Sequence, residues 1–348
     1  MNLFELASQL IDIPSVTGDE KGVGEFLSSF LKHLGYKVEL QEVEKDRFNV
    51  IASTGAPPRV VFSTHMDTVP PHIAASENEK LIFGRGSCDA KGIIAAQITA
   101  AELIRAQGVN EIGLLFTVDE EAGSEGARLA NSLPLASECE YLINGEPTDN
   151  RLATATKGSL RLTLKTKGRA AHSAYPEEGD SAIEKLLDVL EGMRRCQWPG
   201  DALLGETTCN IGVITGGTRA NVIPAEAAAV LQLRLVSDAE TVKSILEKSI
   251  GGRAKVEYLS VHNPVHLFTI TGFEQCVVRF TTDIPYLSRW GKPLLLGPGS
   301  IFQAHTDGEY VNKEELTEAV TLYADLARRL LATQPIEQRE QAAEGAPR

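Results

Sequence analysis

The sequence lacks the paired cysteines that crosslink small domains or hold a structural zinc ion. Its five cysteines are an odd number in 348 residues, and no two of them form a CxxC pair. This usage argues against a disulfide framework and against a zinc finger, and it indicates a reducing compartment. The sequence also lacks an apolar run long enough to span a membrane, and residues 1–6 show no basic stretch followed by an apolar one. We therefore expect a soluble, cytoplasmic protein.

Positive charge is scarce as well. The chain has 34 Lys and Arg against 47 Asp and Glu, which gives a formal net charge of -13. Nucleic acids and anionic membranes attract clustered Lys and Arg, so neither is expected as a partner. The excess of carboxylates favours a cationic metal instead.

The hydrophobic pattern predicts an α/β protein. Apolar strands alternate with helical patterns, which is typical of a central mixed sheet flanked by helices. The predicted strands and helices of this part are at 59–64, 90–107, 112–118 and 141–143, with an earlier helix before Gly35 and a last one at 314–331. Functional residues should gather where the strands end.

From about residue 157 the pattern changes to long alternating strands with two helices, near 181–195 and 242–250. This indicates a compact α+β (ferredoxin-like) insertion that acts as a lid, so the first domain is discontinuous. We predict a catalytic domain at 1–155 and 264–333, and an inserted domain at 156–263. Residues 334–348 lack apolar periodicity and are predicted to be a disordered tail.

Side chains of the types that bind divalent metals follow predicted strands or lie in glycine-rich turns. They are His65, Asp89, Glu121, Glu146 and His305. Hydrolytic zinc sites use imidazole and carboxylate ligands and leave a position for water, and a metal pair needs one bridging carboxylate. Asp89 is the natural bridge, because it lies at a helix N-terminus in the glycine-rich turn 84–92. One such residue alone is more often a capping or solvated group, but together they point to one metal centre.

Two further carboxylates accompany these ligands. Asp67 comes two residues after His65 and is expected to hold the second nitrogen of that imidazole, which fixes the tautomer. Glu120 precedes Glu121 at the end of a buried strand, where adjacent side chains point in opposite directions. One glutamate can then bind metal while the other faces the substrate, and Glu120 is the candidate general base.

The segments that hold these residues resemble one family, the dinuclear zinc amidohydrolases and peptidases. That family includes acetylornithine deacetylase, succinyl-diaminopimelate desuccinylase, aminoacylase and glutamate carboxypeptidase. The resemblance runs to about residue 308 and is closest to acetylornithine deacetylase at 65–70, 84–89, 145–148 and 297–301. It implies that one zinc is bound by His65 and Glu146 and the other by Glu121 and His305. It also implies that Asp89 bridges two zinc ions, for which cobalt or manganese can substitute.

The resemblance further implies that the insertion forms a homodimer and that His172 stabilises the oxyanion in the partner's active site. A surface histidine in a Gly- and Pro-rich loop is the alternative. Asn221 is a candidate substrate donor, or else an asparagine that closes a hairpin in left-handed geometry. Arg234 matches a family arginine that binds the substrate carboxylate. The amides of Gly299 and Ser300 are further candidates, with a plain loop turn as the alternative.

These features predict an enzyme that hydrolyses the amide bond of a small N-acyl amino acid, as acetylornithine deacetylase does. A zinc-bridged water would lose its proton to Glu120 and attack the amide carbon. The segments after Asn221 and after His305 depart from the deacetylase pattern, so a dipeptidase, tripeptidase or carboxypeptidase acting on short peptides is the alternative. A non-catalytic metal-binding homologue is disfavoured, because all the ligands are present.

Overall fold

The structure is a computed structural model that describes residues 2–332. They form two compact units. The first unit contains residues up to Thr154, Leu267–Cys276 and the chain from Thr282 onward, and the second contains Ala155–His266 and Val277–Thr281. The predicted tail at 334–348 lies outside the described residues.

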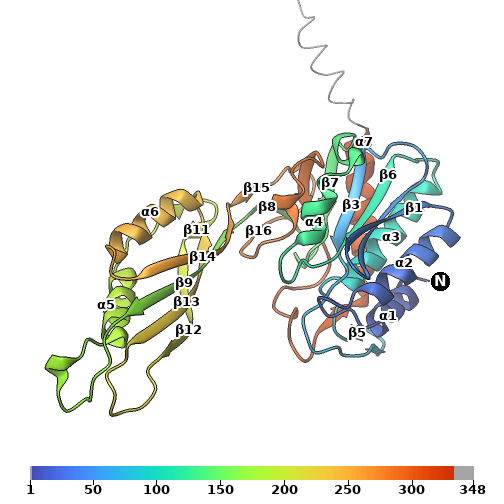
Figure 1. Cartoon of the computed structure of the whole chain (residues 1–348). Coiled ribbons are helices and arrows are strands. Elements are labelled where there is room, and N and C mark those ends of the chain that lie inside the picture. Colours follow the sequence, from blue (N-terminus) through green and yellow to red (C-terminus); the bar gives the residue numbers. More distant parts are fainter. Residues whose placement is uncertain (1, 333–348) are drawn as a thin grey trace, which may run out of the picture. The chain divides into compact units, whose positions relative to one another are not determined.

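The first unit is built on a six-stranded mixed sheet in the order β1-β2-β6-β3-β7-β17 (Figure 1). β1 pairs antiparallel with β2, and β2 with β6, whereas β6, β3, β7 and β17 run parallel to one another. The strands are β1 (Lys37–Glu44), β2 (Arg47–Ser53), β3 (Val60–His65), β6 (Ile112–Thr117), β7 (Tyr141–Asn144) and β17 (Lys292–Leu295). The prediction of an α/β fold with a central mixed sheet is confirmed.

Helices cover both faces of this sheet, which explains why β3 and β6 are buried along their whole length. Phe62 and Leu114 belong to the core shared with α1, α3 and α7, whereas their neighbours Val61 and Leu115 pack in a second core with α4. The helical segments of this unit are α1 (Leu3–Asp12), α2 (Lys21–His33), α3 (Lys91–Arg105), α4 (Glu125–Ala130), α7 (Lys313–Leu331), η1 (Pro134–Ser137) and η3 (Ile284–Tyr286). The helices expected at 90–107 and 314–331 are thus confirmed.

The parallel strands bring their carboxyl ends to one edge of the sheet. β3 ends at His65, β6 ends shortly before Glu120, and β7 ends two residues before Glu146. A small sheet of order β18-β5-β4 lies in the same unit and consists of β4 (Ser76–Glu77), β5 (Leu81–Phe83) and β18 (Tyr310–Asn312). The pairing of β5 with β18 joins the chain before Asp89 to the chain after His305.

The second unit is an antiparallel sheet of order β12-β13-β9-β14 with two helices, the βαββαβ arrangement of a ferredoxin-like fold. Alternate residues of β13, among them Leu231 and Leu233, pack in one core with α5 and α6. Its main elements are β9 (Gly158–Lys167), α5 (Ala182–Arg194), β12 (Thr208–Gly216), β13 (Glu226–Leu235), α6 (Ala239–Ile250) and β14 (Lys255–His262). Its shorter elements are η2 (Pro176–Glu178), β10 (Gly200–Asp201), β11 (Gly205–Glu206) and β15 (Val265–His266). The strands β8 (Leu152–Thr156) and β16 (Gln275–Val278) each contain residues of both units.

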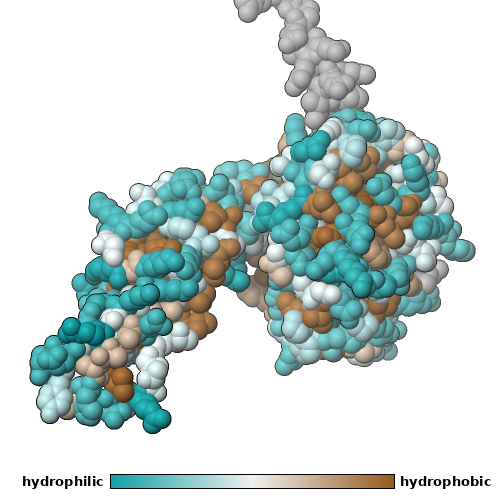
Figure 2. All heavy atoms as spheres, viewed as in Figure 1, coloured by the Kyte–Doolittle hydropathy of each residue, from teal (hydrophilic) through white to brown (hydrophobic). Residues whose placement is uncertain are grey.

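Hydrophilic side chains cover most of the face shown in Figure 2, and apolar side chains form separate patches on both units. Among residues 2–332, no helix is both long enough and apolar enough to cross a membrane. All five cysteines are free thiols, as expected from their spacing.

Candidate metal centre

Three of the predicted ligands lie close enough together to hold one metal ion. His65, Asp89 and Glu121 each offer a ligand atom, and these atoms lie within 4.8 Å of one another. They come from the end of β3, from the turn before α3 and from the segment after β6. The parallel sheet therefore gathers side chains that are far apart in the sequence.

The carboxylate of Asp89 faces two imidazoles at once. Its Oδ1 lies 2.9 Å from Nε2 of His65, and its Oδ2 lies 3.3 Å from Nε2 of His305. The same nitrogen of His305 is 2.7 Å from Oε1 of Glu121. One oxygen directed to each histidine is the arrangement that a carboxylate bridging two metal ions needs.

Glu146 lies two residues beyond β7 and is only 4% exposed. Its Oε1 is buried and has no hydrogen-bond partner among the described residues. A buried carboxylate oxygen without a partner is costly, and a divalent cation would satisfy it. This orphaned oxygen and the imidazole and carboxylate donors around it fit a metal centre.

The pKa values of the carboxyl groups show a crowded, buried set of negative charges. Burial, followed by the nearby Glu146 carboxylate, raises the pKa of Glu120 well above its ordinary value. Burial, followed by the charge of Asp89, does the same for Glu146. Bound cations would offset this repulsion, so the electrostatics also fit a metal-binding site.

The imidazoles show the complementary effect. Burial alone would lower the pKa of His65, but hydrogen bonds to Asp67 and Asp89 outweigh it, and the pKa lies well above its ordinary value. The hydrogen bonds of His305 to Asp89 and Glu121 raise its pKa to about 10. In the metal-free chain, these carboxylates thus favour the protonated imidazoles, and protons compete with metal for the ring nitrogens.

Asp67 contacts the second imidazole nitrogen of His65 through both its backbone and its side chain. Nδ1 of His65 lies 2.9 Å from the backbone carbonyl oxygen of Asp67 but 3.5 Å from its carboxylate. A neutral His65 would donate its Nδ1 hydrogen to this carbonyl and keep Nε2 for metal. The Asp67 carboxylate also accepts hydrogen bonds from the backbone amides of Glu120 and Glu121, each at 3.1 Å. Asp67 therefore positions the candidate base and its metal-binding neighbour.

The sequence analysis missed Asp283, a buried carboxylate beside this cluster. Its Oδ2 accepts a hydrogen bond of 2.8 Å from Oγ1 of Thr117, while Oδ1 is buried without a partner among the described residues. Burial raises the pKa of Asp283 to about 6, and its charge contributes to the raised pKa of Glu120. Asp283 follows no predicted strand and carries no motif, so the sequence gave no signal for it.

Gly299 and Ser300 pack against the turn that carries Asp89. Gly299 has a φ of +80°, and a Cβ there would lie 2.6 Å from Sγ of Cys88. Ser300 accepts a hydrogen bond from the same sulfur at 3.4 Å through its backbone carbonyl. Burial raises the pKa of Glu315, and the nearby backbone amide of Gly299 opposes that shift.

The remaining candidates belong to the second unit. His172 is exposed and forms an isolated bridge with Val222, and the amide of Ser173 donates to the carbonyl of Asn221 at 3.0 Å. Asn221 is not among the described residues with positive φ, so the alternative of a left-handed asparagine is wrong.

Arg234 lies half-buried on β13, where burial and then the charge of Arg161 lower its pKa.

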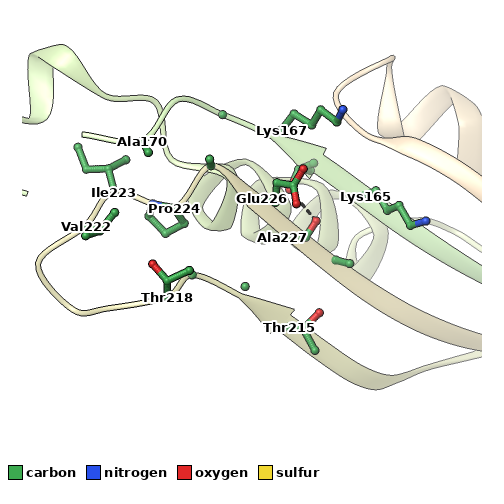
Figure 3. A pocket seen from close by; sticks show the side chains of 16 residues that line it. Lys165, Lys167, Ala170, Thr215, Thr218, Val222, Ile223, Pro224, Glu226 and Ala227 are labelled. Atoms are coloured by element: carbon green, nitrogen blue, oxygen red, sulfur yellow. Dashed lines mark hydrogen bonds between the residues drawn. The ribbon is translucent and has the colours of Figure 1, made fainter. Parts of the chain in front are cut away.

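A cavity of about 790 Å³ lies beside the His172 and Asn221 segments (Figure 3). Residues at the ends of β9, β12 and β13 line it, with Lys165, Lys167 and Glu226 among the charged ones. None of the predicted metal ligands contributes to it. The chemistry expected of the metal centre is therefore not located in this cavity.

Comparison with known proteins places the chain in a family. Residues 154–251 match a family model described as the peptidase dimerisation domain. A peptidase M20 domain-containing protein of Schizosaccharomyces pombe is 40% identical over 334 residues, which covers 92% of this chain and 83% of the relative. The chain belongs to the M20 peptidase family. Another relative, a probable carboxypeptidase of Aspergillus terreus, is 36% identical over 362 residues, which cover 91% of this chain and 84% of that protein.

The M20 fold is also seen in a solved structure. The YXEP protein of Bacillus subtilis, described as a dinuclear metal binding peptidase from the M20 family, aligns with a TM-score of 0.71 at 16% identity. The alignment covers 95% of this chain and 98% of that one. Because its M20 relatives are peptidases and carboxypeptidases by name, this chain is a hydrolase of amide bonds.

Proposed function

We propose that the protein is a dinuclear metal hydrolase that cleaves a linear amide bond next to a residue with a free carboxylate. The observation that carries the proposal is the Asp89 carboxylate, which directs one oxygen to His65 and the other to His305. Two imidazoles and three carboxylates suit a pair of zinc ions, with cobalt or manganese as substitutes. Bound metal would polarise the substrate carbonyl and lower the pKa of a water molecule.

Each residue then has a defined task. His65 and Glu146 would hold one metal and Glu121 and His305 the other, with Asp89 shared between them. Glu120 is the base, because its carboxyl group lies in the same buried cluster and its raised pKa suits it to take a proton from the attacking water. The same carboxyl would then deliver that proton to the departing nitrogen.

Two substrate classes are compatible with this chemistry. The similarity to acetylornithine deacetylase in the metal-site segments supports a small N-acyl amino acid, such as acetylornithine. The name of the relative that is 36% identical, a probable carboxypeptidase, supports a short peptide cleaved at its C-terminal residue. Arg234 of the second unit is the candidate partner for the substrate carboxylate in either class.

A substrate panel tests the function and separates the two classes. N-acetyl, N-succinyl and carbamoyl amino acids and dipeptides would be assayed with zinc, cobalt or manganese. Each substrate would be compared with the same compound whose C-terminal carboxylate is converted to an amide. We expect hydrolysis of at least one class, and a large loss of kcat/KM when the carboxylate is amidated, because the pairing charge is removed. The proposal fails if the metal-loaded protein hydrolyses none of them, and carboxylate recognition fails if the amides react equally well.

We also propose a homodimer formed through the second unit, in which His172 serves the partner's active site. The match of residues 154–251 to a dimerisation domain supports the dimer. Mixing inactive His172→Ala and Glu120→Ala proteins, with subunit exchange, should restore about a quarter of wild-type activity, because half of the random dimers carry one intact site. If His172 acts within its own subunit, each hybrid site keeps a defect and the mixture stays inactive.

A cytoplasmic location is proposed on chemical grounds. All five cysteines are free thiols, and two of them, Cys88 and Cys139, are buried. A reducing compartment keeps such thiols unpaired. Recovery of the active protein from an oxidising compartment, with its cysteines in disulfides, would contradict this assignment.

A further inference from the structure

Glu309 is a buried glutamate that accepts hydrogen bonds from the turn that carries Asp89. It is 1% exposed, and its Oε1 accepts three backbone hydrogen bonds, from Gly86 at 3.0 Å, Cys88 at 3.0 Å and Asp89 at 3.1 Å. One carboxylate oxygen facing three amides is a strong anion site made of backbone dipoles. The carboxylate therefore fixes the path of this turn.

Arg85 supplies the opposite charge and a second connection. It is 1% exposed, and its Nη1 lies 2.6 Å from Oε2 of Glu309. The same nitrogen donates a hydrogen bond of 3.0 Å to the carbonyl of Thr306, the residue next to His305. The pair thus touches both the Asp89 turn and the His305 loop.

Stability alone is a weak reason to bury such a pair. Desolvation of two charges cancels much of their attraction, and apolar residues of similar volume often stabilise a protein equally well. The backbone pairing of β5 with β18 already joins these two segments, since Tyr310 pairs with Phe83 and the amide of Gly84 donates to the carbonyl of Glu309. The ion pair adds contacts that fix the positions of the two loops beyond the short pairing of β5 with β18.

We propose that Arg85 and Glu309 are positioning residues of the metal centre. They hold the Asp89 turn and the His305 loop in register, so that the Asp89 carboxylate reaches both histidines. This inference rests on the proposed metal-dependent function. Because metal sites accept ligand distances only within about 0.2 Å, a small shift between the two loops would weaken the bridge without removing any ligand.

The test is Glu309→Gln, which keeps an oxygen for the three amides but removes the charge opposite Arg85. Zinc affinity, measured by chelator competition on dialysed protein, should fall by about 10- to 100-fold, as for other residues that support metal ligands. The visible absorption of the cobalt-loaded protein should change, because it reports the coordination geometry. At limiting zinc, the apparent kcat of the variant should fall in proportion to the fraction of sites that hold zinc. It should recover when zinc is in excess.

The matched control is Glu140→Gln. It breaks a partly buried ion pair of the first unit, between Glu140 and Arg59 at 2.6 Å, with side chains 15% and 17% exposed. These residues precede β7 and β3 and lie at the strand ends remote from the ligands. We expect this variant to lose thermal stability while its zinc affinity and cobalt spectrum stay at wild-type values.

Wild-type zinc affinity and an unchanged cobalt spectrum in folded Glu309→Gln protein would overturn the positioning role, even if its thermal stability fell as in the control. If that variant does not fold, the Arg85→Lys variant tests the positioning role in its place. Lysine keeps the charge but lacks the guanidinium fork, so zinc affinity should fall, and an unchanged value would reject the role. A wild-type chain that binds no zinc, cobalt or manganese contradicts the proposed function itself, which is a different result from equal binding by wild type and variants.

Discussion

Replacement of Glu120 by alanine should lower kcat by about two to four orders of magnitude while both metals stay bound. The reason is that the missing carboxylate is the proton carrier, and general acid-base catalysis contributes on that scale. The ligands His65, Asp89 and Glu121 are untouched by the change. Steady-state kinetics with a matched metal analysis of the same sample is the measurement.

Glu125→Ala is the control for this variant. It removes the same functional group from the start of α4, where the Glu125 side chain is 63% exposed and pairs only at 3.4 Å with Arg128. We expect turnover within about twofold of wild type, as for an exposed charge outside the site. Near wild-type turnover in metal-replete Glu120→Ala protein would refute the role of Glu120 as base.

Removal of the metals should abolish activity and lower the stability of the first unit. Burial, followed by the repulsion of neighbouring carboxylates, raises the pKa values of Glu120 and Glu146. A metal present at 100 times its dissociation constant would stabilise the folded state by about 2.7 kcal/mol through linkage. Dialysis against a chelator should therefore speed hydrogen exchange in β3, β6 and β7, and added zinc should reverse both effects.

The second unit is the internal control of that experiment. It contains none of the predicted metal ligands, so exchange in the core strands β9 and β13 should not change on chelation. Chelated Glu120→Ala protein should show the same shift as chelated wild type, because it keeps the ligands. Full activity after exhaustive removal of metal, or equal effects on both units, would argue against a metal centre in the first unit.

The local pattern was sufficient for the fold class and for most elements. β3 and β6 are short and mostly apolar, whereas α3 and α7 have long helical patterns. Burial of an element on one or both faces therefore leaves a direct signal in the order of its residues. The same logic placed His65 and Glu121 at strand ends. His65, Glu121 and Glu146 were found because parallel strands bring their carboxyl ends together, and Asp89 was found from the glycine-rich turn before a helix.

The tertiary structure alone decided how the carboxylates are used. Asp67 was expected to contact His65 through its side chain, but no pattern indicated that the same carboxylate also accepts hydrogen bonds from the amides of Glu120 and Glu121. Asp283 comes from a distant segment without any motif, and its link to Thr117 spans 166 positions. Glu309 meets the amide of Asp89 across 220 positions. Secondary structure follows from neighbours along the chain, but a buried carboxylate takes whichever donors the packed chain leaves within reach, and no local pattern encodes that choice.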